Sequence, residues 1–251
     1  MKINIGAGKF KKPGWVRIDH GSGHYKHYGK FQDVDIDFMK SQRFPMEDDS
    51  VDVAYCSHVF EHLPDEVIKK IIQDTFRVLK PGGIFRITCP DAIAGTNAML
   101  NNDNSFFSLY DEYAVFNEDR FKKKYSRTIP LKDASIYQKY MYMVMSPKCI
   151  HIDVPCEKFT DEQIVSLFDS MPMGSALDVI CKPIDPEIHQ KNPWMHISWW
   201  SIGKITSILK AAGFSEAGGS DYGQSRCEEM RDTEHFDKVF PHFSLYVEAV
   251  K

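Results

Sequence analysis

Short apolar runs separated by turn residues dominate the first ninety residues of the chain. Runs of this kind predict β-strands, and they lie at residues 3–5, 15–19, 33–37, 51–56 and 84–89. Between the last two runs, apolar residues recur at three- and four-residue steps from Ile68 to Leu79, which predicts a helix over residues 65–79. Strands that alternate with helical or loop crossovers indicate a parallel sheet.

The middle of the chain, residues 92–195, loses this rhythm and mixes aromatic residues, charges and short helical segments. The best-marked helix there covers residues 160–168, because Thr160 and Gln163 have the spacing of a capping box. An insertion of this size in a sheet domain commonly forms a lid or a substrate pocket. A partly ordered surface decoration is the alternative interpretation.

The alternating pattern returns in residues 196–251. A helical stripe of apolar residues begins at Ile202, a strand follows near Phe214, and residues 243–250 have the pattern of a last strand. The chain has no internal repeat and no low-complexity tract. We therefore expect a single α/β domain over residues 1–251 that carries the middle region as an insertion.

The composition is that of an ordinary globular protein, with 43% hydrophobic and 26% charged residues among 251. A formal net charge of −4 argues against a general nucleic-acid-binding protein. No run reaches the roughly 18 apolar residues of a membrane helix, and the chain enters a strand at once, so we expect no signal peptide. The six cysteines lie scattered without a CxxC motif, which fits reduced thiols in a cytoplasmic protein.

The first candidate site is the run Asn4-Ile5-Gly6-Ala7-Gly8 at the end of the first strand. Two glycines one residue apart let the backbone turn sharply and approach a ligand closely. Such a turn lies where open parallel sheets bind cofactors, beyond the carboxyl ends of the strands. A dinucleotide-binding fingerprint would have a third glycine at the position of Lys11, which disfavours a pyrophosphate-binding site and with it a nicotinamide enzyme.

Acidic residues end the second and third predicted strands. Asp19 follows the second strand, where an ionised carboxylate can accept both hydroxyl hydrogens of a ribose. A turn aspartate is the alternative for this position. Asp37 and Phe38 follow the third strand and offer a carboxylate for an adenine amino group and a ring for its face.

With these residues the chain resembles the class I S-adenosylmethionine-dependent methyltransferases. The segments that carry the resemblance, in the order and near the spacings of that family, are INIGAG (3–8), FPMEDDSVD (44–52), SHVFEHL (57–63), RVLKPGG (77–83) and LKAAGF (209–214). The resemblance implies a Rossmann-like, mostly parallel seven-stranded sheet whose last strand is antiparallel, with a largely helical insertion as a lid. It also implies an enzyme that uses S-adenosyl-L-methionine and releases S-adenosyl-L-homocysteine.

The resemblance assigns cofactor-binding roles motif by motif. They fall on Gly6 and Gly8 with Asn4 and Ala7 of the same turn for the methionine part, Asp19 for the ribose, Asp37 and Phe38 for the adenine, and Ser57 and His58 for the side that faces cofactor and substrate. The sequence departs from the family pattern in two places. Asn4 stands where an acid is common, and only ten residues separate Gly8 from Asp19, so the loop 9–14 must shorten or replace the first helix.

His58, Glu61 and His62 have the HxxEH spacing of metal ligands on one helix face. Related methyltransferases carry a similar cluster, and some members use theirs to hold a divalent cation. Pro64 leaves barely one helical turn here, so we assign these residues packing and capping roles and expect no metal.

A hydroxyl acceptor must lose a proton during methyl transfer, and histidine is suited to take it. The candidates are His58, His151, His189 and His196. We favour His196 as the catalytic base, because it lies just before the helix that begins at Ile202 and related enzymes often have a histidine there. His151 is the second choice, and a packed structural histidine is the alternative for either.

The acceptor is only weakly encoded. Residues 120–127 form a basic run that fits either a solvated surface or a site for a phosphate- or nucleotide-linked acceptor. Trp194, Trp199 and Trp200 could stack against a sugar or pack in a core. The pattern as a whole resembles methyltransferases of bacterial surface-polysaccharide (capsule) pathways, which implies a small polar acceptor such as a sugar hydroxyl or a phosphoramidate.

Two other functions stay open at this point. One is a catalytically silent cofactor-binding subunit or regulator on the same fold, and the other is an N-methyltransferase of a small metabolite. The choice between oxygen and nitrogen as the acceptor atom and the oligomeric state also stay open.

Overall fold

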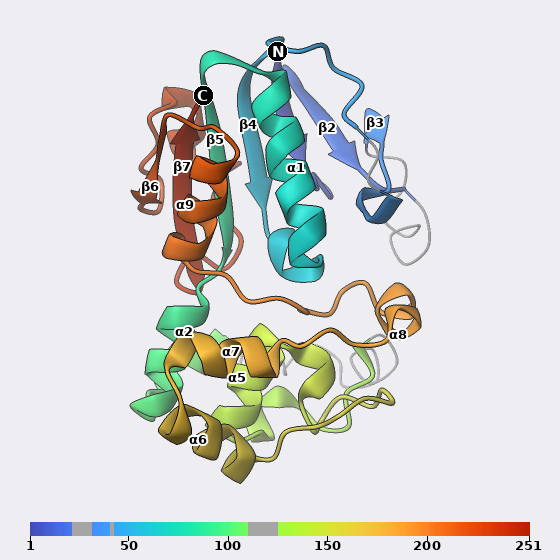
Figure 1. The fold of residues 1–251 in the computed structure, drawn as a ribbon, viewed down its shortest axis with the longest axis vertical. Helices are drawn as coiled ribbons and strands as arrows, with labels where there is room; N and C mark the ends of the chain where they lie inside the picture. Colours follow the sequence, from blue (N-terminus) through green and yellow to red (C-terminus); the bar gives the residue numbers. More distant parts are fainter. Residues whose placement is uncertain (22–31, 41–42, 110–124) are drawn as a thin grey trace. The chain divides into compact units, whose positions relative to one another are not determined.

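The computed structural model describes residues 1–21, 32–40, 43–109 and 125–251 of the chain (Figure 1). The chain divides into two compact units, one formed by Met1–Pro90 with Trp200–Lys251 and the other by Asp91–Trp199. The first unit holds the sheet, and the second is largely helical.

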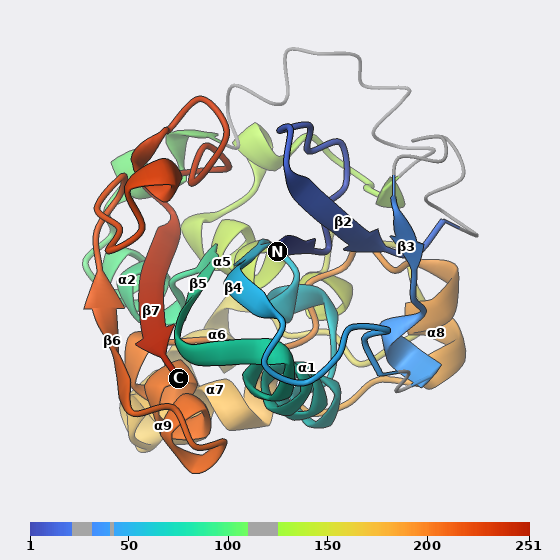
Figure 2. The same cartoon turned by 90° about the horizontal axis from the view of Figure 1, so that it is seen from above.

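A single sheet forms the centre of the first unit, and within the described residues it has seven strands in the order β3-β2-β1-β4-β5-β7-β6 (Figure 2). The strands are β1 Lys2–Ile5, β2 Trp15–Asp19, β3 Val34–Asp35, β4 Val51–Ser57, β5 Leu79–Pro90, β6 Glu216–Ser220 and β7 Ser244–Val250. Strand β7 runs antiparallel to both β5 and β6, and the other neighbours are parallel. The predicted fold class is therefore confirmed.

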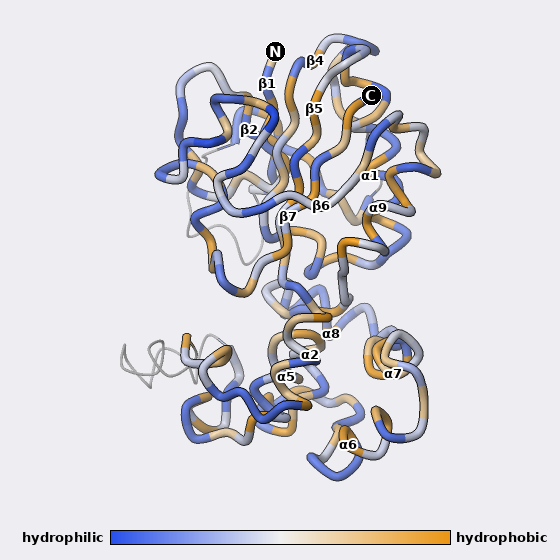
Figure 3. Tube along the Cα trace, turned by 90° about the vertical axis from the view of Figure 1, so that its left-hand side faces the viewer, coloured by the Kyte–Doolittle hydropathy of each residue, from blue (hydrophilic) through white to orange (hydrophobic). Residues whose placement is uncertain are grey.

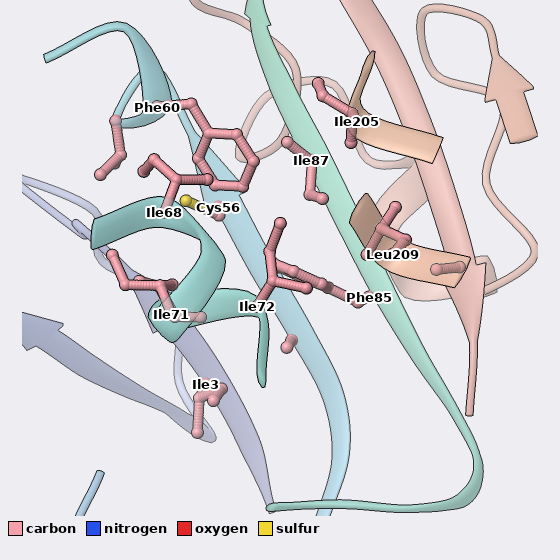
Figure 4. Close-up of a cluster of buried hydrophobic side chains, with 14 of the residues drawn as sticks. Ile3, Cys56, Phe60, Ile68, Ile71, Ile72, Phe85, Ile87, Ile205 and Leu209 are labelled. Carbon is pink, nitrogen blue, oxygen red and sulfur yellow. The ribbon is translucent and has the colours of Figure 1, made fainter. Parts of the chain in front are cut away.

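Two helices cover one face of this sheet. They are α1 (Asp65–Val78) and α9 (Ile202–Ala211), whose apolar stripes pack on the alternate residues of the central strands that face them. Figure 4 shows Ile68 and Ile72 of α1 and Leu209 of α9 pointing at the same core. The central strands β4 and β5 are buried on both faces, so they carry hydrophobic residues along much of their length (Figure 3).

The opposite face is covered by the segment between β6 and β7, residues 221–243, which we call the β6–β7 connection (Figure 2). Residues 6–14, all of them described, form turns and no helix, as the short spacing between Gly8 and Asp19 predicts. Met230 and Phe236 of the connection pack on Trp15, Val53 and Tyr55 of the sheet instead. A long-range loop thus takes the place that the first helix of the fold would fill.

A buried ion pair holds the β6–β7 connection to the sheet. Arg86 of β5 is fully buried, and its Nη2 lies 2.5 Å from Oδ2 of Asp237 in the connection. Its Nη1 also donates to Glu248 of β7 at 3.0 Å. Burial lowers the pKa of Arg86, but the hydrogen bonds and charges of Asp237 and Glu248 outweigh this effect and raise it. The guanidinium therefore stays charged, with two carboxylates to balance it.

The second unit contains α2 Ala92–Leu100, α5 Ile136–Val144, α6 Asp161–Ser170, α7 Met173–Ile180 and α8 Pro186–Lys191. The predicted helix near residue 160 is confirmed as α6, and both hydrogen bonds of the capping box between Thr160 and Gln163 are present. Within the ranges that the structure describes, no helix has the length and apolar character to cross a membrane.

Three predicted strand limits were wrong. The third strand covers only Val34–Asp35, because Asp37 caps the 3₁₀ helix Phe38–Lys40 by accepting from Met39 N. The strand predicted near Phe214 begins at Glu216, because Phe214 N still donates to Leu209 O at the end of α9. Strand β5 begins earlier than predicted, because Leu79 already pairs with Val51 and a shift in register follows.

Candidate functional site

The glycine turn after β1 forms the centre of the candidate site. Gly6 and Gly8 both have left-handed backbone, with φ of 68° and 51°, a conformation that glycine adopts without the usual steric cost. The amides of Gly6 and Ala7 donate to Ile18 O of β2, at 2.8 and 3.3 Å. A Cβ at Gly6 would lie 2.1 Å from Val59 Cγ2, whereas one at Gly8 would meet no atom of the described residues within 4 Å. The turn is thus held against β2 on one side and against Val59 on the other.

Asp19 closes the open side of this turn. Its Oδ2 accepts from Gly8 N at 2.6 Å and its Oδ1 from His20 N at 2.7 Å. A carboxylate has about four acceptor positions, so hydroxyl donors can still bind beside these two amides. Burial raises the pKa of Asp19, although both backbone hydrogen bonds oppose that shift. The predicted ribose-binding residue therefore lies beside the glycine turn, at the carboxyl edge of the sheet.

His20 connects the acidic residues that end β2 and β3, and its position was missed by the sequence analysis. Its Nδ1 lies 3.1 Å from Asp35 Oδ1, and its Nε2 lies 4.0 Å from Asp37 Oδ2. Asp35 also accepts from Gly21 N at 3.2 Å, and these contacts lower its pKa. Asp37 caps the following 3₁₀ helix and pairs with Lys40 at 3.3 Å, so it has a structural contact of its own at the edge predicted to meet adenine.

Asn4 and Ser57 lie on the sheet face that the β6–β7 connection covers. Asn4 is buried and alternates with Ile3 and Ile5, which face the α1 side. Ser57 ends β4 and is the register partner of Thr88 on β5. Thr88 is 1% exposed, and its buried hydroxyl has no hydrogen-bond partner among the described residues, so a polar group near the carboxyl edge can meet a water or a ligand.

His58, the next residue along the chain, is tied down on both ring nitrogens. Its Nδ1 lies 2.9 Å from Glu61 Oε1, and its Nε2 lies 3.0 Å from Val239 O and 2.9 Å from Ser244 Oγ. Glu61 is 2% exposed and lies in the short 3₁₀ helix Phe60–His62. The imidazole is therefore engaged in packing contacts at the position where the spacing also suggested a metal ligand.

In the second unit, His196 is held by its backbone and by its ring. Its amide donates to Ser146 Oγ at 3.1 Å, and its carbonyl accepts from Ser146 N at 3.0 Å. The ring Nδ1 lies 2.5 Å from Met143 O. A carbonyl can only accept, so Nδ1 carries the hydrogen, and in the neutral ring Nε2 is then the basic nitrogen.

His151 is less well held. Its carbonyl accepts from Thr128 N at 2.9 Å, which fixes the backbone and leaves the ring orientation to other contacts. Burial lowers the pKa of the ring, and the charge of Asp161 partly opposes that shift.

Aromatic residues surround one arginine of the predicted basic run. Arg127 lies 4.5 Å from the centre of the Tyr142 ring and 5.5 Å from that of Tyr125, and its Nη2 donates to Tyr142 Oη at 2.6 Å. The ring of Trp194 meets Tyr125 edge-on at 5.0 Å. All four side chains are half-buried. The rest of the run, residues 120–124, lies outside the described residues.

The other two tryptophans do not continue this cluster. Trp199 donates from Nε1 to Asp178 at 2.9 Å. Trp200 is 1% exposed and packs edge-on against Phe60 in the core of the first unit. Of the stacking wall considered from the sequence, Trp194 lies beside Tyr125 and Tyr142, the two rings that flank Arg127.

Comparison with known proteins agrees with this architecture. Residues 21–87 match the family described as methyltransferase domain. A probable S-adenosylmethionine-dependent methyltransferase of Mycolicibacterium smegmatis is 33% identical over 90 residues, which cover 34% of this chain and 34% of that protein. The match thus spans about a third of the length of this curated relative.

Solved structures of methyltransferases also resemble the chain. The apo S-adenosylmethionine-dependent methyltransferase SibL is 11% identical with a TM-score of 0.41, covering 100% of this chain and 50% of that one. A S-adenosylmethionine-dependent methyltransferase from Archaeoglobus fulgidus is 14% identical with a TM-score of 0.42, covering 100% and 85%.

The sheet order and the matched segment point to the same fold class. A mostly parallel sheet of order 3-2-1-4-5-7-6 with an antiparallel seventh strand is typical of class I methyltransferases. The described sheet therefore has the α/β fold that is typical of class I methyltransferases, and residues 21–87 carry the match to the methyltransferase-domain family.

Proposed function

We propose that the chain transfers a methyl group from S-adenosyl-L-methionine to a small polar acceptor. The observation that carries this proposal is the glycine turn closed by Asp19 at the carboxyl edge of the sheet. At Gly6 any side chain would collide with Val59, so glycine there lets the turn pack closely, whereas at Gly8 a Cβ would meet no described atom within 4 Å and a ligand could approach the backbone. A carboxylate beside such a turn fits the hydroxyls of a ribose.

The same residues fit the cofactor part by part. The turn Asn4–Gly8 would meet the methionine portion, Asp19 the ribose, and Asp37 with Phe38 the adenine, while Ser57 and His58 lie at the neighbouring strand end. S-adenosylmethionine, when bound, supplies a methyl group on a positively charged sulfur. The chain has to hold that group in line with the acceptor, so positioning contributes most of the rate.

His196 is the residue assigned to the acceptor proton, with His151 as the second choice. The hydrogen bond from Nδ1 to Met143 O assigns the hydrogen of the neutral ring to Nδ1, so Nε2 is the nitrogen that would take the proton of an acceptor hydroxyl as the new oxygen–carbon bond forms. Ser146 holds the backbone of the same residue from both sides. A fixed ring and a defined tautomer are what a general base needs.

The acceptor class assigned here is a phosphate- or nucleotide-linked sugar or a phosphoramidate of a surface-polysaccharide precursor. Arg127 between Tyr125 and Tyr142, with Trp194 beside them, supports an anionic group next to a ring. The resemblance to surface-polysaccharide methyltransferases supports the same class. An amine acceptor would arrive deprotonated and need no base.

Two measurements test the proposed function. Calorimetry with S-adenosylhomocysteine should show binding, and NADH should give no thermal shift. Mass spectrometry of reactions with S-adenosylmethionine and a panel of nucleotide-sugars and phosphoramidates should then show a methylated product. Binding without any product across the panel would favour a catalytically silent cofactor-binding subunit, and no binding at all would overturn the proposal.

A further inference from the structure

His58 has a backbone conformation that its surroundings must impose. Its φ is 53°, in the left-handed region where residues other than glycine are uncommon. Its side chain is only 10% exposed. Strained backbone of this kind persists where neighbouring contacts fix it, and it concentrates at functional sites.

The contacts of His58 with the β6–β7 connection require its Nε2 to donate. Val239 O can only accept, and it lies 3.0 Å from Nε2. Ser244 Oγ lies 2.9 Å from Phe240 O and 3.2 Å from Val239 O, so its hydrogen points to a carbonyl and its oxygen accepts from Nε2. On the other side of the ring, Nδ1 faces the Glu61 carboxylate at 2.9 Å. The ring is therefore held on both sides, by the connection at Nε2 and by Glu61 at Nδ1, and it acts as a clamp.

The partners of Nε2 lie in or directly after the β6–β7 connection, which is itself fixed to the sheet. Asp237, two residues before Val239, is fully buried and accepts from Arg86 through both carboxylate oxygens. Its amide also donates to Tyr55 Oη at 2.7 Å. The carbonyl that His58 binds is therefore not a free loop atom, and it has a rigid support on β4 and β5.

The residue that His58 places is Val59. His58 turns the chain through the left-handed region, and Val59 is the next residue. This turn places a methyl group of Val59 in the space beside Gly6. Gly6 in turn donates to Ile18 O, and the turn it begins ends at Gly8 on Asp19. A continuous series of contacts thus runs from the buried Arg86–Asp237 pair through His58 and Val59 to the glycine turn.

We propose that His58 is a positioning residue for cofactor binding, which clamps the β6–β7 connection to the loop after β4 and thereby holds the glycine turn in shape. The inference rests on the proposed function, because it assigns the cofactor to that turn. It gives the β6–β7 connection a role that the missing first helix would otherwise perform.

The test uses the full-length chain and S-adenosylhomocysteine as the probe, measured by calorimetry. His58→Gly removes the ring and leaves a residue that accepts the left-handed backbone, so strain does not confuse the result. We expect about tenfold weaker binding, as for the loss of hydrogen bonds worth about 1.4 kcal/mol. Millimolar imidazole should occupy the vacated space and restore most of the affinity, while it leaves wild-type binding unchanged.

A matched control separates positioning from a general loss of stability. Ile205→Ala creates a cavity in the core under α9, away from the connection, and should lower thermal stability without weakening binding in the folded protein. If His58→Gly does not fold, His58→Asn carries the same expectation, because asparagine tolerates the left-handed region. Ring ¹⁵N spectra of the wild type should show a hydrogen on Nε2 of His58.

The possible outcomes distinguish this inference from the proposed function. If the wild type fails to bind S-adenosylhomocysteine, the proposed function itself is wrong. If the wild type binds and the folded His58 variant binds equally well, the positioning role is overturned while the proposed function stands. An Nε2 without hydrogen in the ¹⁵N spectra would also overturn the clamp.

Discussion

At the scale of single residues, the two glycines of the turn after β1 differ in a way that a mutation can measure. Both are left-handed, but only Gly6 lacks space for a side chain. Gly8→Ala should cost only the left-handed strain, about 1–2 kcal/mol, and keep binding of S-adenosylhomocysteine measurable. Gly6→Ala should cost more stability and abolish binding, because Val59 must move. Equal effects of the two variants in chemical denaturation and calorimetry would contradict the role given to Val59.

Asp19 predicts how cofactor binding depends on pH. Its pKa in the folded protein is raised above the ordinary value of 3.8, chiefly by burial. Ribose hydroxyls donate to the ionised form, so binding should weaken as pH falls through this raised pKa, with a midpoint above 3.8. For the free protein the sign is opposite, since the protonated form is favoured on folding and that contribution is lost as pH rises through the folded pKa.

The matched variant for this prediction is Asp19→Asn, which keeps the shape and removes the charge. It should bind S-adenosylhomocysteine about ten- to a hundredfold more weakly at neutral pH, as for charge-assisted hydrogen bonds worth roughly 1.5–3 kcal/mol. Its binding should no longer change with pH in the acid range. A folded variant with unchanged affinity would move the ribose role to Asp35 or Asp37.

At the scale of elements, the buried pair between Arg86 and Asp237 predicts how strongly the β6–β7 connection is held. Asp237→Asn keeps the volume and suits the left-handed φ of 54°, but it removes one of the two carboxylates that balance the buried guanidinium. Breaking such a pair costs about 3–5 kcal/mol, which urea denaturation would show. The control is Glu216→Gln, which breaks an exposed pair with Arg226 and should leave the urea midpoint unchanged.

Elements with a strong local period were predictable from the sequence, and the β6–β7 connection was not. Strand β2 was predictable from its apolar run, helix α1 from its apolar stripe at three- and four-residue steps, and helix α6 from its capping box. The connection is held by polar contacts such as Arg86 to Asp237, which are 151 residues apart. No local pattern encodes a pairing of that kind.

The candidate site divides in the same way. Gly6, Gly8 and Asp19 could be proposed from the sequence because a turn and an acid lie at the ends of predicted strands, and the structure places Asp19 beside Gly8. His20 between two carboxylates and Val59 against Gly6 were missed, because their roles depend on which strand ends become neighbours in the sheet. The strand order of the sheet is therefore needed to predict the roles of His20 and Val59.

At the scale of the whole molecule, the residues assigned to the cofactor and the residue assigned to the acceptor proton belong to different compact units. Gly6 and Asp19 lie in the first unit, and His196 lies in the second, where Met143 and Ser146 of the same unit hold it. Binding and chemistry should therefore separate on mutation. His196→Ala should keep full affinity for S-adenosylhomocysteine and lower turnover about a hundredfold or more, as for the loss of a general base.

The pH profile then distinguishes a base from a packed side chain. Wild-type turnover should fall on acidification as the imidazole takes up a proton, and His196→Ala should lack that limb. A structural histidine would instead give a variant of lower thermal stability whose activity follows the folded fraction. The matched control is His151→Ala, which also replaces a histidine of the second unit by alanine. This variant should keep the fall in turnover at acid pH. A stable His196 variant with near-normal turnover would reject His196 as the base. The reaction would then use His151 as its base or have an amine acceptor. Loss of the acid limb in His151→Ala would indicate His151.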